Sequence, residues 1–207
     1  QRTALIAGAS GLVGGECLRR LLASDAYTKV TVVTRRSLGS DAKHQKLREI
    51  VVDFAQLDRI KAELRADHVF CALGTTIRKA GSQAKFRQVD FEYPRHLAQL
   101  TRGNGARHFS LVSALGACSK SGVFYSRVKG ELEDALRAMG WPGLCLLRPS
   151  VIAGERQESR PLERMGEWLL RFGPSTYRPV AAGRIAAAML ATAQREPRGV
   201  TILESRE

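Results

Sequence analysis

The chain has 207 residues, 44% of them hydrophobic, and its 33 lysines and arginines outnumber 20 aspartates and glutamates, for a formal charge of +13. This length suits one α/β domain with an ordinary core, so residues 1–207 are expected to form a single domain. No apolar run approaches the roughly 20 residues of a membrane helix, so no membrane span is expected. The positive charges are scattered along the chain, which favours a basic surface that attracts an anionic cofactor over a nucleic-acid-binding protein.

The four cysteines, Cys17, Cys71, Cys118 and Cys145, form no Cys-x-x-Cys pair and have no histidine at metal-binding spacing. They are expected to be reduced core residues, and no metal site is expected. With no secretory segment visible, the chain is predicted to be cytoplasmic. The first strand begins within three residues of Gln1, so the native N-terminus is expected upstream.

Residues 3–15 (TALIAGASGLVGG) predict a buried strand, a tight turn and a helix in direct succession. In such a unit the first glycine allows a sharp turn, the second lets the backbone approach a pyrophosphate, and the third lets the helix pack on the strand. The helix N-terminus then attracts the phosphates, so a dinucleotide is the expected ligand. Glycines that serve only the turn are the alternative, because the spacing is Gly-x-x-Gly-x-x-Gly rather than Gly-x-Gly-x-x-Gly. The residues of this unit expected to bind the cofactor are Gly8, Ser10, Gly11, Leu12, Val13 and Gly14.

The second expected strand, residues 29–34, ends in Arg35-Arg36 rather than in a carboxylate. At this position an acidic side chain binds the ribose 2′-hydroxyl of NAD(H), whereas an arginine meets the 2′-phosphate of NADP(H). NADP(H) is therefore favoured, with a solvated arginine loop as the alternative. The third strand, residues 49–53, ends at Asp53, which either reaches the adenine beside Phe54 or caps a helix.

Further strands are expected at 66–76, 106–113, 143–152 and 199–203, with helices at 86–102, 125–139 and 184–195. This alternation predicts a Rossmann-like, doubly wound parallel sheet. Ligands gather at the carboxyl ends of parallel strands, so Leu73, Gly74 and Thr75 are expected at the cofactor. Lys79 and Lys85 are expected in a loop that closes over the site, and His108 on the surface rather than in catalysis.

Ser113 ends one of these strands, and Tyr125 and Lys129 open the helix that follows. Four residues are just over one helical turn, so the hydroxyl and the ammonium project from one face. An adjacent ammonium stabilises a phenolate, which suits a phenol to exchange a proton with a carbonyl or alcohol while hydride moves. Ser113 is expected to orient the substrate oxygen, and Lys129 also to bind the nicotinamide ribose. Alone, the pair is equally an amphipathic helical turn.

Together, the glycine turn, the strand-end serine and the Tyr-x-x-x-Lys pair resemble the short-chain dehydrogenase/reductases, specifically their atypical or extended branch, over almost the whole chain. A narrower similarity is to the Tat-interacting-protein (metastasis suppressor) subgroup and its bacterial relatives, named nucleoside-diphosphate-sugar epimerases by analogy. It rests on residues 71–76, 79–81, 89–90, 129–131 and 156–161.

This resemblance implies NADP(H) binding on a Rossmann fold with a small C-terminal part, and it places the nicotinamide over Pro149 and Val151. It does not imply a substrate. Related sequences often carry two serines at the end of the fifth strand, whereas here the second is Ala114. If that second serine is the one that orients the substrate oxygen, only Ser119 or Ser121 in the next loop could replace it.

Only residues 151–207 follow Ser150, near the end of the sixth strand, so the substrate cap, expected at 150–182, is small. Arg156 and Arg160 lie on one face if this segment is helical, and either bind an anionic substrate group or form a solvated face. The expected function is an NADP(H)-dependent oxidoreductase acting on a small carbonyl or anionic compound. The alternatives are an NADP(H)-binding redox sensor with a protein partner, and a sugar-nucleotide epimerase, which the length disfavours. A homodimer is compatible with the sequence, and neither a membrane nor nucleic acid is expected as a partner.

Overall fold

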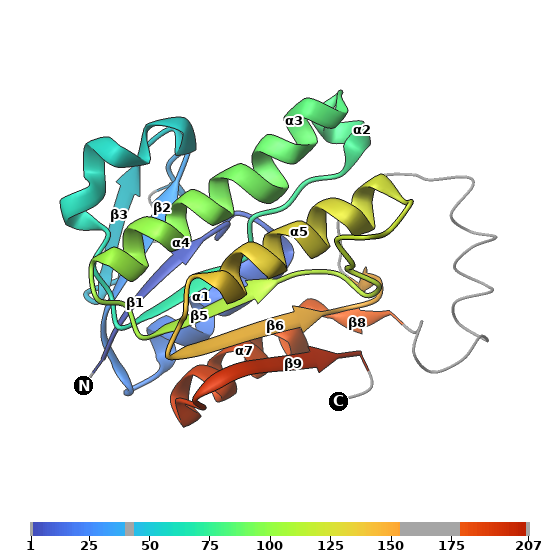
Figure 1. Ribbon diagram of the computed structural model, residues 1–207. Helices are drawn as coiled ribbons and strands as arrows, with labels where there is room; N and C mark the ends of the chain where they lie inside the picture. The colour runs from blue at the N-terminus through green and yellow to red at the C-terminus, as the bar shows by residue number, and fades with distance from the viewer. Residues whose placement is uncertain (1, 40–43, 154–178, 206–207) are drawn as a thin grey trace.

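The main feature of the protein is a sheet of seven parallel strands (Figure 1). A computed structural model describes residues 2–39, 44–153 and 179–205. From edge to edge the strands are β3 (Leu47–Val51), β2 (Tyr27–Thr34), β1 (Arg2–Ala7), β4 (His68–Cys71), β5 (His108–Val112), β6 (Gly143–Arg148) and β9 (Gly199–Glu204). The chain order runs outward from β1 in both directions, which confirms the predicted doubly wound, Rossmann-like sheet. A second, two-stranded sheet pairs β7 (Ile152–Ala153) with β8 (Val180–Ala181).

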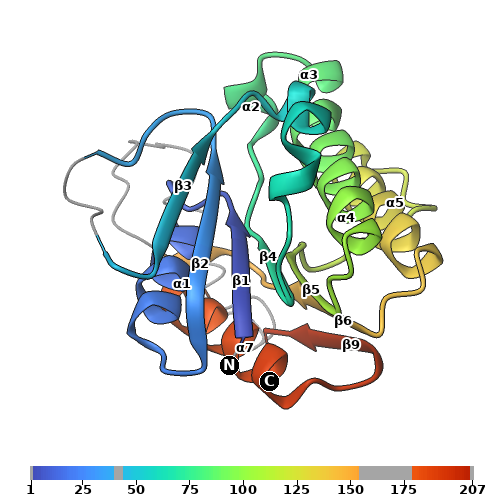
Figure 2. The same cartoon turned by 90° about the vertical axis from the view of Figure 1, so that its left-hand side faces the viewer.

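Helices cover both faces of the large sheet, as Figure 2 shows. On one face, α1 (Leu12–Ala23) packs beside α7 (Ala182–Arg195). On the other lie the 3₁₀ segment η2 (Phe54–Glu63), α4 (Tyr93–Gly103) and α5 (Phe124–Ala138). The central strands are therefore buried on both sides, which explains why they read as continuous apolar runs.

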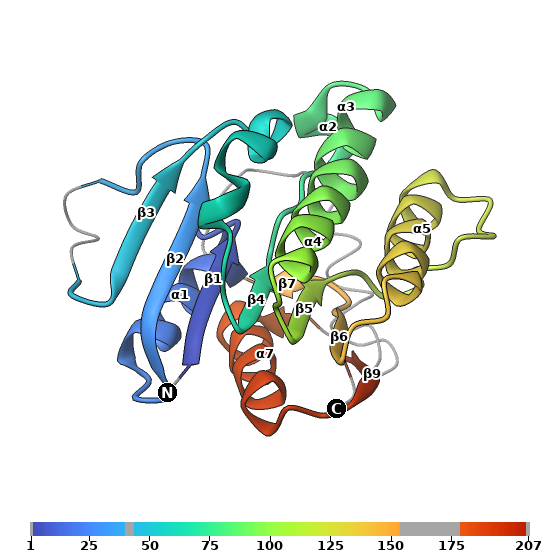
Figure 3. The same cartoon turned by 60° about the vertical axis from the view of Figure 1, so that its left-hand side comes forward.

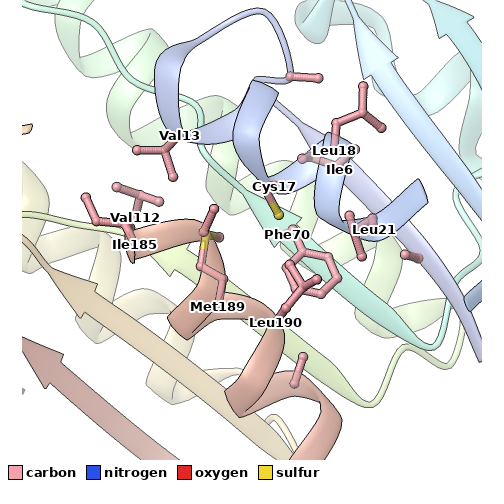
Figure 4. Close-up of a cluster of buried hydrophobic side chains, with 14 of the residues drawn as sticks. Ile6, Val13, Cys17, Leu18, Leu21, Phe70, Val112, Ile185, Met189 and Leu190 are labelled. Carbon is pink, nitrogen blue, oxygen red and sulfur yellow. The ribbon is translucent and has the colours of Figure 1, made fainter. Parts of the chain in front are cut away.

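Alternate residues of each strand supply two separate cores. Ile6 and Phe70 pack under α1 and α7 in the cluster of Figure 4. Their neighbours Leu5 and Val69 point to the opposite face and pack under α4 and α5. This division holds both helical layers against one sheet, so the strand ends form a rigid base for a ligand site.

The segment between β4 and α4 differs from the prediction of a loop around Lys79 and Lys85 followed by one helix. Two short helices, α2 (Ile77–Ala80) and α3 (Gln83–Arg87), fill the loop because a threonine and a serine hydroxyl cap their first turns. A π-helical turn, η3 (Gln88–Glu92), then joins α3 to α4. In Figure 3, α2 and α3 lie at the N-terminal end of α4.

His108 is also placed differently: it is 1% exposed, so the prediction of a surface residue is wrong. It begins a central strand, and its Nε2 lies 2.9 Å from the Ser110 hydroxyl. The room for its ring comes from Gly143 on β6, where a Cβ would lie 2.9 Å from Nδ1. Of the cysteines, Cys118 is exposed and the other three are buried.

Most of the predicted substrate cap at 150–182 lies outside the described residues, and Arg156 and Arg160 lie there too.

Candidate functional site

The glycine turn brings the N-terminus of α1 directly against the ends of β1 and β4. Gly8 has a φ of +89°, and a Cβ there would lie 2.5 Å from the Ala72 carbonyl oxygen. At Gly14 a Cβ would lie 2.0 Å from the Gly8 carbonyl oxygen, so α1 approaches the turn more closely than any side chain permits. The N-cap of α1 is Gly11, and no side chain caps the helix. Its first N–H groups and its positive dipole end are therefore available to an anion.

A cavity of about 810 Å³ opens beside this turn, over the carboxyl ends of β1, β2 and β4. Of the residues predicted to bind the cofactor, those that line it are Gly8, Ser10, Gly11, Arg35, Arg36, Phe54, Leu73, Gly74 and Thr75. Lys79, expected in a loop that closes over the site, lines it too, and the lining residues that were not predicted there are Val33, Thr34, Ser37, Leu38, Ala72, Val89 and Tyr93. The size and the lining suit an extended dinucleotide.

The remaining predicted cofactor residues lie outside the lining of this cavity. Leu12, Val13 and Gly14 form the first turn of α1 behind the glycine turn. Pro149 lines a separate cavity of about 130 Å³ against α7, and Val151 is 43% exposed beyond it. The positions of Asp53 and Lys129 are described below.

Arg35 and Arg36, at one end of the cavity, belong to a segment that side-chain hydrogen bonds hold in place. The Thr34 hydroxyl donates to the carbonyl oxygen of Arg36 at 2.8 Å. Farther along, the Glu49 carboxylate accepts from the Ser37 hydroxyl at 2.8 Å and from the Leu38 N–H at 2.7 Å. Arg35 and Arg36 are exposed, and within the described part of the chain neither forms a salt bridge. Their charge is therefore available to a ligand.

Asp53 caps a helix, which is one of the two roles predicted for it. Its Oδ1 accepts a hydrogen bond from the Ala55 N–H at 2.9 Å, at the start of η2. Next to it, Phe54 lies beneath Tyr93, with ring centroids 5.8 Å apart. Burial, with Asp53 nearby, raises the pKa of Tyr93, so its hydroxyl stays protonated at neutral pH. Tyr93 was missed as a site residue because helical spacing assigned it to the core.

Lys129 is held by a buried carboxylate rather than pointing into solvent. Its side chain is 5% exposed, and its ammonium forms an ion pair with Oδ1 of Asp90 at 2.7 Å. Burial alone would lower the pKa of Lys129, but the Asp90 carboxylate and the nearby Tyr125 raise it overall. The lysine is therefore charged, and it adjoins the cavity at Gly74, where a Cβ would lie 3.8 Å from Nζ.

Tyr125 lies one turn before Lys129 on α5, as the four-residue spacing predicts. It is 36% exposed, so a substrate can reach its hydroxyl. Its ring packs against that of Phe86 of α3, with centroids 5.6 Å apart. The pair thus combines an accessible phenol with a buried ammonium.

Ser113 is engaged in a different network from the one predicted. It is 5% exposed, and its hydroxyl donates to Oε1 of Glu133 at 2.6 Å. Glu133 is fully buried on α5 and also accepts from the Arg148 guanidinium at 2.6 and 3.0 Å and from Arg137 at 3.1 Å. A hydroxyl has one proton to donate, so Ser113 cannot give it to a substrate oxygen while this bond stands. The next residue, Ala114, is buried and carries no hydroxyl.

The two loop serines proposed as replacements are Ser119 and Ser121. Ser121 accepts the Val123 N–H at 3.1 Å just before α5 begins. Within the described residues, no group of three histidine, cysteine, aspartate or glutamate side chains is arranged to hold a metal ion. No helix in that part of the chain has the length and apolar character needed to cross a bilayer.

A doubly wound parallel sheet with a glycine turn after its first strand and a cleft over its strand ends defines a dinucleotide-binding domain of the Rossmann type. The chain belongs to the NAD(P)H-binding family, which matches residues 8–141. It is 38% identical to protein HTATIP2 of Rattus norvegicus over 172 residues, which cover 82% of this chain and 69% of that protein. It is 34% identical over 168 residues to the mitochondrial protein fmp52 of Emericella nidulans, covering 78% of this chain and 71% of the relative. The predicted family is thereby confirmed.

Solved structures show the same fold at low sequence identity. MoeE5 in complex with UDP-glucose and NAD superimposes with a TM-score of 0.75 at 18% identity, covering 97% of this chain and 75% of MoeE5. The UDP-Glc/GlcNAc 4-epimerase of Campylobacter jejuni gives a TM-score of 0.74 at 16% identity, covering all of this chain and 81% of the epimerase. These likenesses confirm the Rossmann-type fold.

Proposed function

We propose that this protein is an oxidoreductase that uses NADP(H) and transfers hydride to or from a carbonyl or alcohol substrate. The observation that carries the proposal is the accessible Tyr125 one turn from the charged, buried Lys129, which in turn adjoins the dinucleotide cavity at Gly74. A charged lysine beside a phenol is the arrangement that proton transfer from tyrosine requires.

The residues present fit a dinucleotide. At Gly8 and Gly14 a Cβ would meet backbone atoms at 2.5 and 2.0 Å, so only glycine allows this tight turn, and the uncapped start of α1 faces the same turn. At the other end of the cavity, the exposed Arg35 and Arg36 suit the doubly charged 2′-phosphate of NADP(H). Within the described residues no carboxylate lines this end, as one would to bind a ribose 2′-hydroxyl.

In this proposal each site residue has one task. The cofactor, when bound, supplies or accepts the hydride. Tyr125 donates a proton to the carbonyl oxygen as hydride arrives, and the Lys129 ammonium stabilises the phenolate that remains. Ser113 takes no part, because its proton is held by Glu133.

The first experiment is a calorimetric titration with NADPH and with NADH. We expect NADPH to bind the wild-type protein more tightly than NADH. Arg35→Ala/Arg36→Ala should weaken NADPH binding by about 30-fold and NADH binding by less than about threefold, because only NADPH carries the 2′-phosphate.

Arg48→Ala is the matched control, since Arg48 sits on the neighbouring strand β3, pairs with Glu63 and does not line the cavity. If the double variant binds both nucleotides like the wild type, the arginines do not select the cofactor. If neither nucleotide binds the wild-type protein, it is not an NADP(H)-dependent oxidoreductase and the proposal is wrong.

A second candidate function, a cofactor-binding redox sensor with little catalysis, is favoured by one observation. At the end of β5, the Ser113 hydroxyl donates its proton to Glu133, and the next residue, Ala114, has no hydroxyl. A screen of carbonyl substrates with NADPH separates the two candidates. Turnover that Tyr125→Phe abolishes supports the oxidoreductase, whereas NADPH binding without turnover of any carbonyl class supports the sensor.

A further inference from the structure

The buried carboxylate of Asp90 contacts both the wall of the cofactor cavity and Lys129 of the Tyr125–Lys129 pair. Asp90 is 1% exposed and lies in the π-helical turn η3. Its Oδ2 accepts the Thr75 N–H at 2.8 Å, and its Oδ1 pairs with Lys129 Nζ at 2.7 Å. Thr75 lines the cavity, so a single side chain holds both the turn that borders the cofactor and the ammonium that serves Tyr125.

The π-helical turn explains how Asp90 reaches this position. A π-helical turn changes which residues of a helix share a face, and such turns recur at functional sites. Here Val89 and Tyr93 face the cavity while Asp90 is fully enclosed beneath it. Gly74, which lines the cavity, adjoins the carboxylate, since a Cβ there would lie in ordinary contact with Asp90 Oδ1 at 3.5 Å.

A carboxylate at this distance offsets much of the field of the ammonium in a buried site. We propose that Asp90 is a positioning residue that fixes Lys129 and moderates the charge that Lys129 presents to Tyr125, while it also anchors the Thr75 turn. This role rests on the proposed function of the Tyr125–Lys129 pair.

Other charged and titratable groups near the pair are already accounted for. The Cys71 thiol at the end of β4 is buried, and burial raises its pKa to about 12, so it is neutral. Arg87 of α3 is paired with Glu131 of α5. Arg127 donates to the carbonyl oxygens of the turn before α5. Lys85, beside Phe86 on α3, is solvent-exposed and therefore screened.

The test is Asp90→Asn, which keeps an oxygen that can accept from Thr75 but removes the charge. Formation of the Tyr125 phenolate is followed by near-ultraviolet absorbance, as the difference between each protein and its Tyr125→Phe counterpart, with circular dichroism to confirm folding. We expect the midpoint of phenolate formation to move to lower pH by about one unit. NADPH affinity should stay within about threefold, because the Thr75 contact is kept.

Glu92→Gln is the matched control, because Glu92 lies in the same turn with its side chain exposed. It should leave both the midpoint and the NADPH affinity unchanged. A midpoint in Asp90→Asn that is unchanged, or that rises, would overturn the proposal. So would an equal shift in Glu92→Gln, which would show a general effect of surface charge.

If Asp90→Asn does not fold, the double variant Asp90→Asn/Lys129→Met replaces it, since it buries no unpaired charge. Its midpoint should rise by less than about one unit, because Asp90 offsets much, but not all, of the charge that Lys129 presents to Tyr125. A rise of more than about one unit would show that Lys129 acts unopposed, and it would refute the proposal. These titrations need no substrate, so they give an answer even if the protein turns over no carbonyl and the proposed function fails.

Discussion

Because His108, the first residue of β5, is buried, we expect the protein to lose stability in mild acid. Burial, with His68 nearby, lowers the pKa of His108 to about 4. The pKa of a histidine in the unfolded chain is about 6.5, so between pH 6.5 and 4 the unfolded chain binds a proton that the folded protein does not. The free energy of unfolding must therefore fall as the pH falls through this window. The full difference amounts to about 3 kcal/mol, of which about 2 kcal/mol is lost between pH 7 and pH 5.

Other titratable groups also change the free energy of unfolding with pH, and their effects can be told apart by the pH range in which they occur. The pKa of His68 is also lowered by burial, although Glu196 opposes this, so His68 adds to the loss in the same window. The pKa values of Asp67 and Glu196 are lowered by their hydrogen bonds and cationic neighbours. The stability that these carboxylates provide is present above their unfolded pKa, about 4, and disappears below it. The interval from pH 7 to pH 5 therefore reports on the histidines.

The assay is urea unfolding of the wild type and of His108→Gln at pH 7 and pH 5. Glutamine keeps a polar nitrogen near Ser110 but does not titrate, so the variant should lose about 2 kcal/mol less than the wild type over this interval. His44→Gln is the control, since His44 is exposed, and it should behave like the wild type. If His108→Gln retains the full pH dependence of the wild type, the reasoning from burial is refuted.

Two further substitutions test the site. Ser113→Ala should destabilise the protein by about 1–2 kcal/mol in urea unfolding, because Glu133 loses a donor, while any carbonyl reduction stays within about threefold of wild type. A loss of activity above about 100-fold with unchanged stability would instead make Ser113 catalytic. Gly14→Ala should weaken NADPH binding by at least about tenfold in calorimetry, because its Cβ would meet the Gly8 carbonyl at 2.0 Å. Gly15→Ala, whose Cβ would meet its nearest atom at 3.4 Å, should bind NADPH normally, and equal losses in both would rule out the steric argument.

The fold could be predicted from the sequence because its signals are local. The strands of the sheet's centre are short apolar runs, and each is followed by helical periodicity or a glycine turn. The strand-turn-helix unit at Gly8 and the arginines at the end of β2 depend on residues within a few positions of one another. The structure places Gly8, Arg35 and Arg36 in one cavity, as this local pattern indicates.

What the sequence did not predict depends on partners that are distant along the chain. Ser113 differs from its expected role because its partner Glu133 lies 20 residues away on α5. Asp90 was noticed only as part of a family motif, because a π-helical turn breaks the helical spacing on which the prediction of one helix over 86–102 relied. His108 was placed on the surface because the glycine that makes room for it lies on another strand.

The helix α5 shows why a residue pattern does not by itself establish chemistry. It carries Tyr125 and Lys129 on the side of the cleft and Glu133 one turn farther on, and both of its buried charges meet partners from other elements. Lys129 is compensated by Asp90, and Glu133 binds Arg148 and takes the proton of Ser113. Each contact is needed because an unpaired charge in this interior would cost several kcal/mol. Both ion pairs therefore contribute to the stability of α5, whereas the role proposed for Tyr125 depends on the nearer pair, Lys129–Asp90.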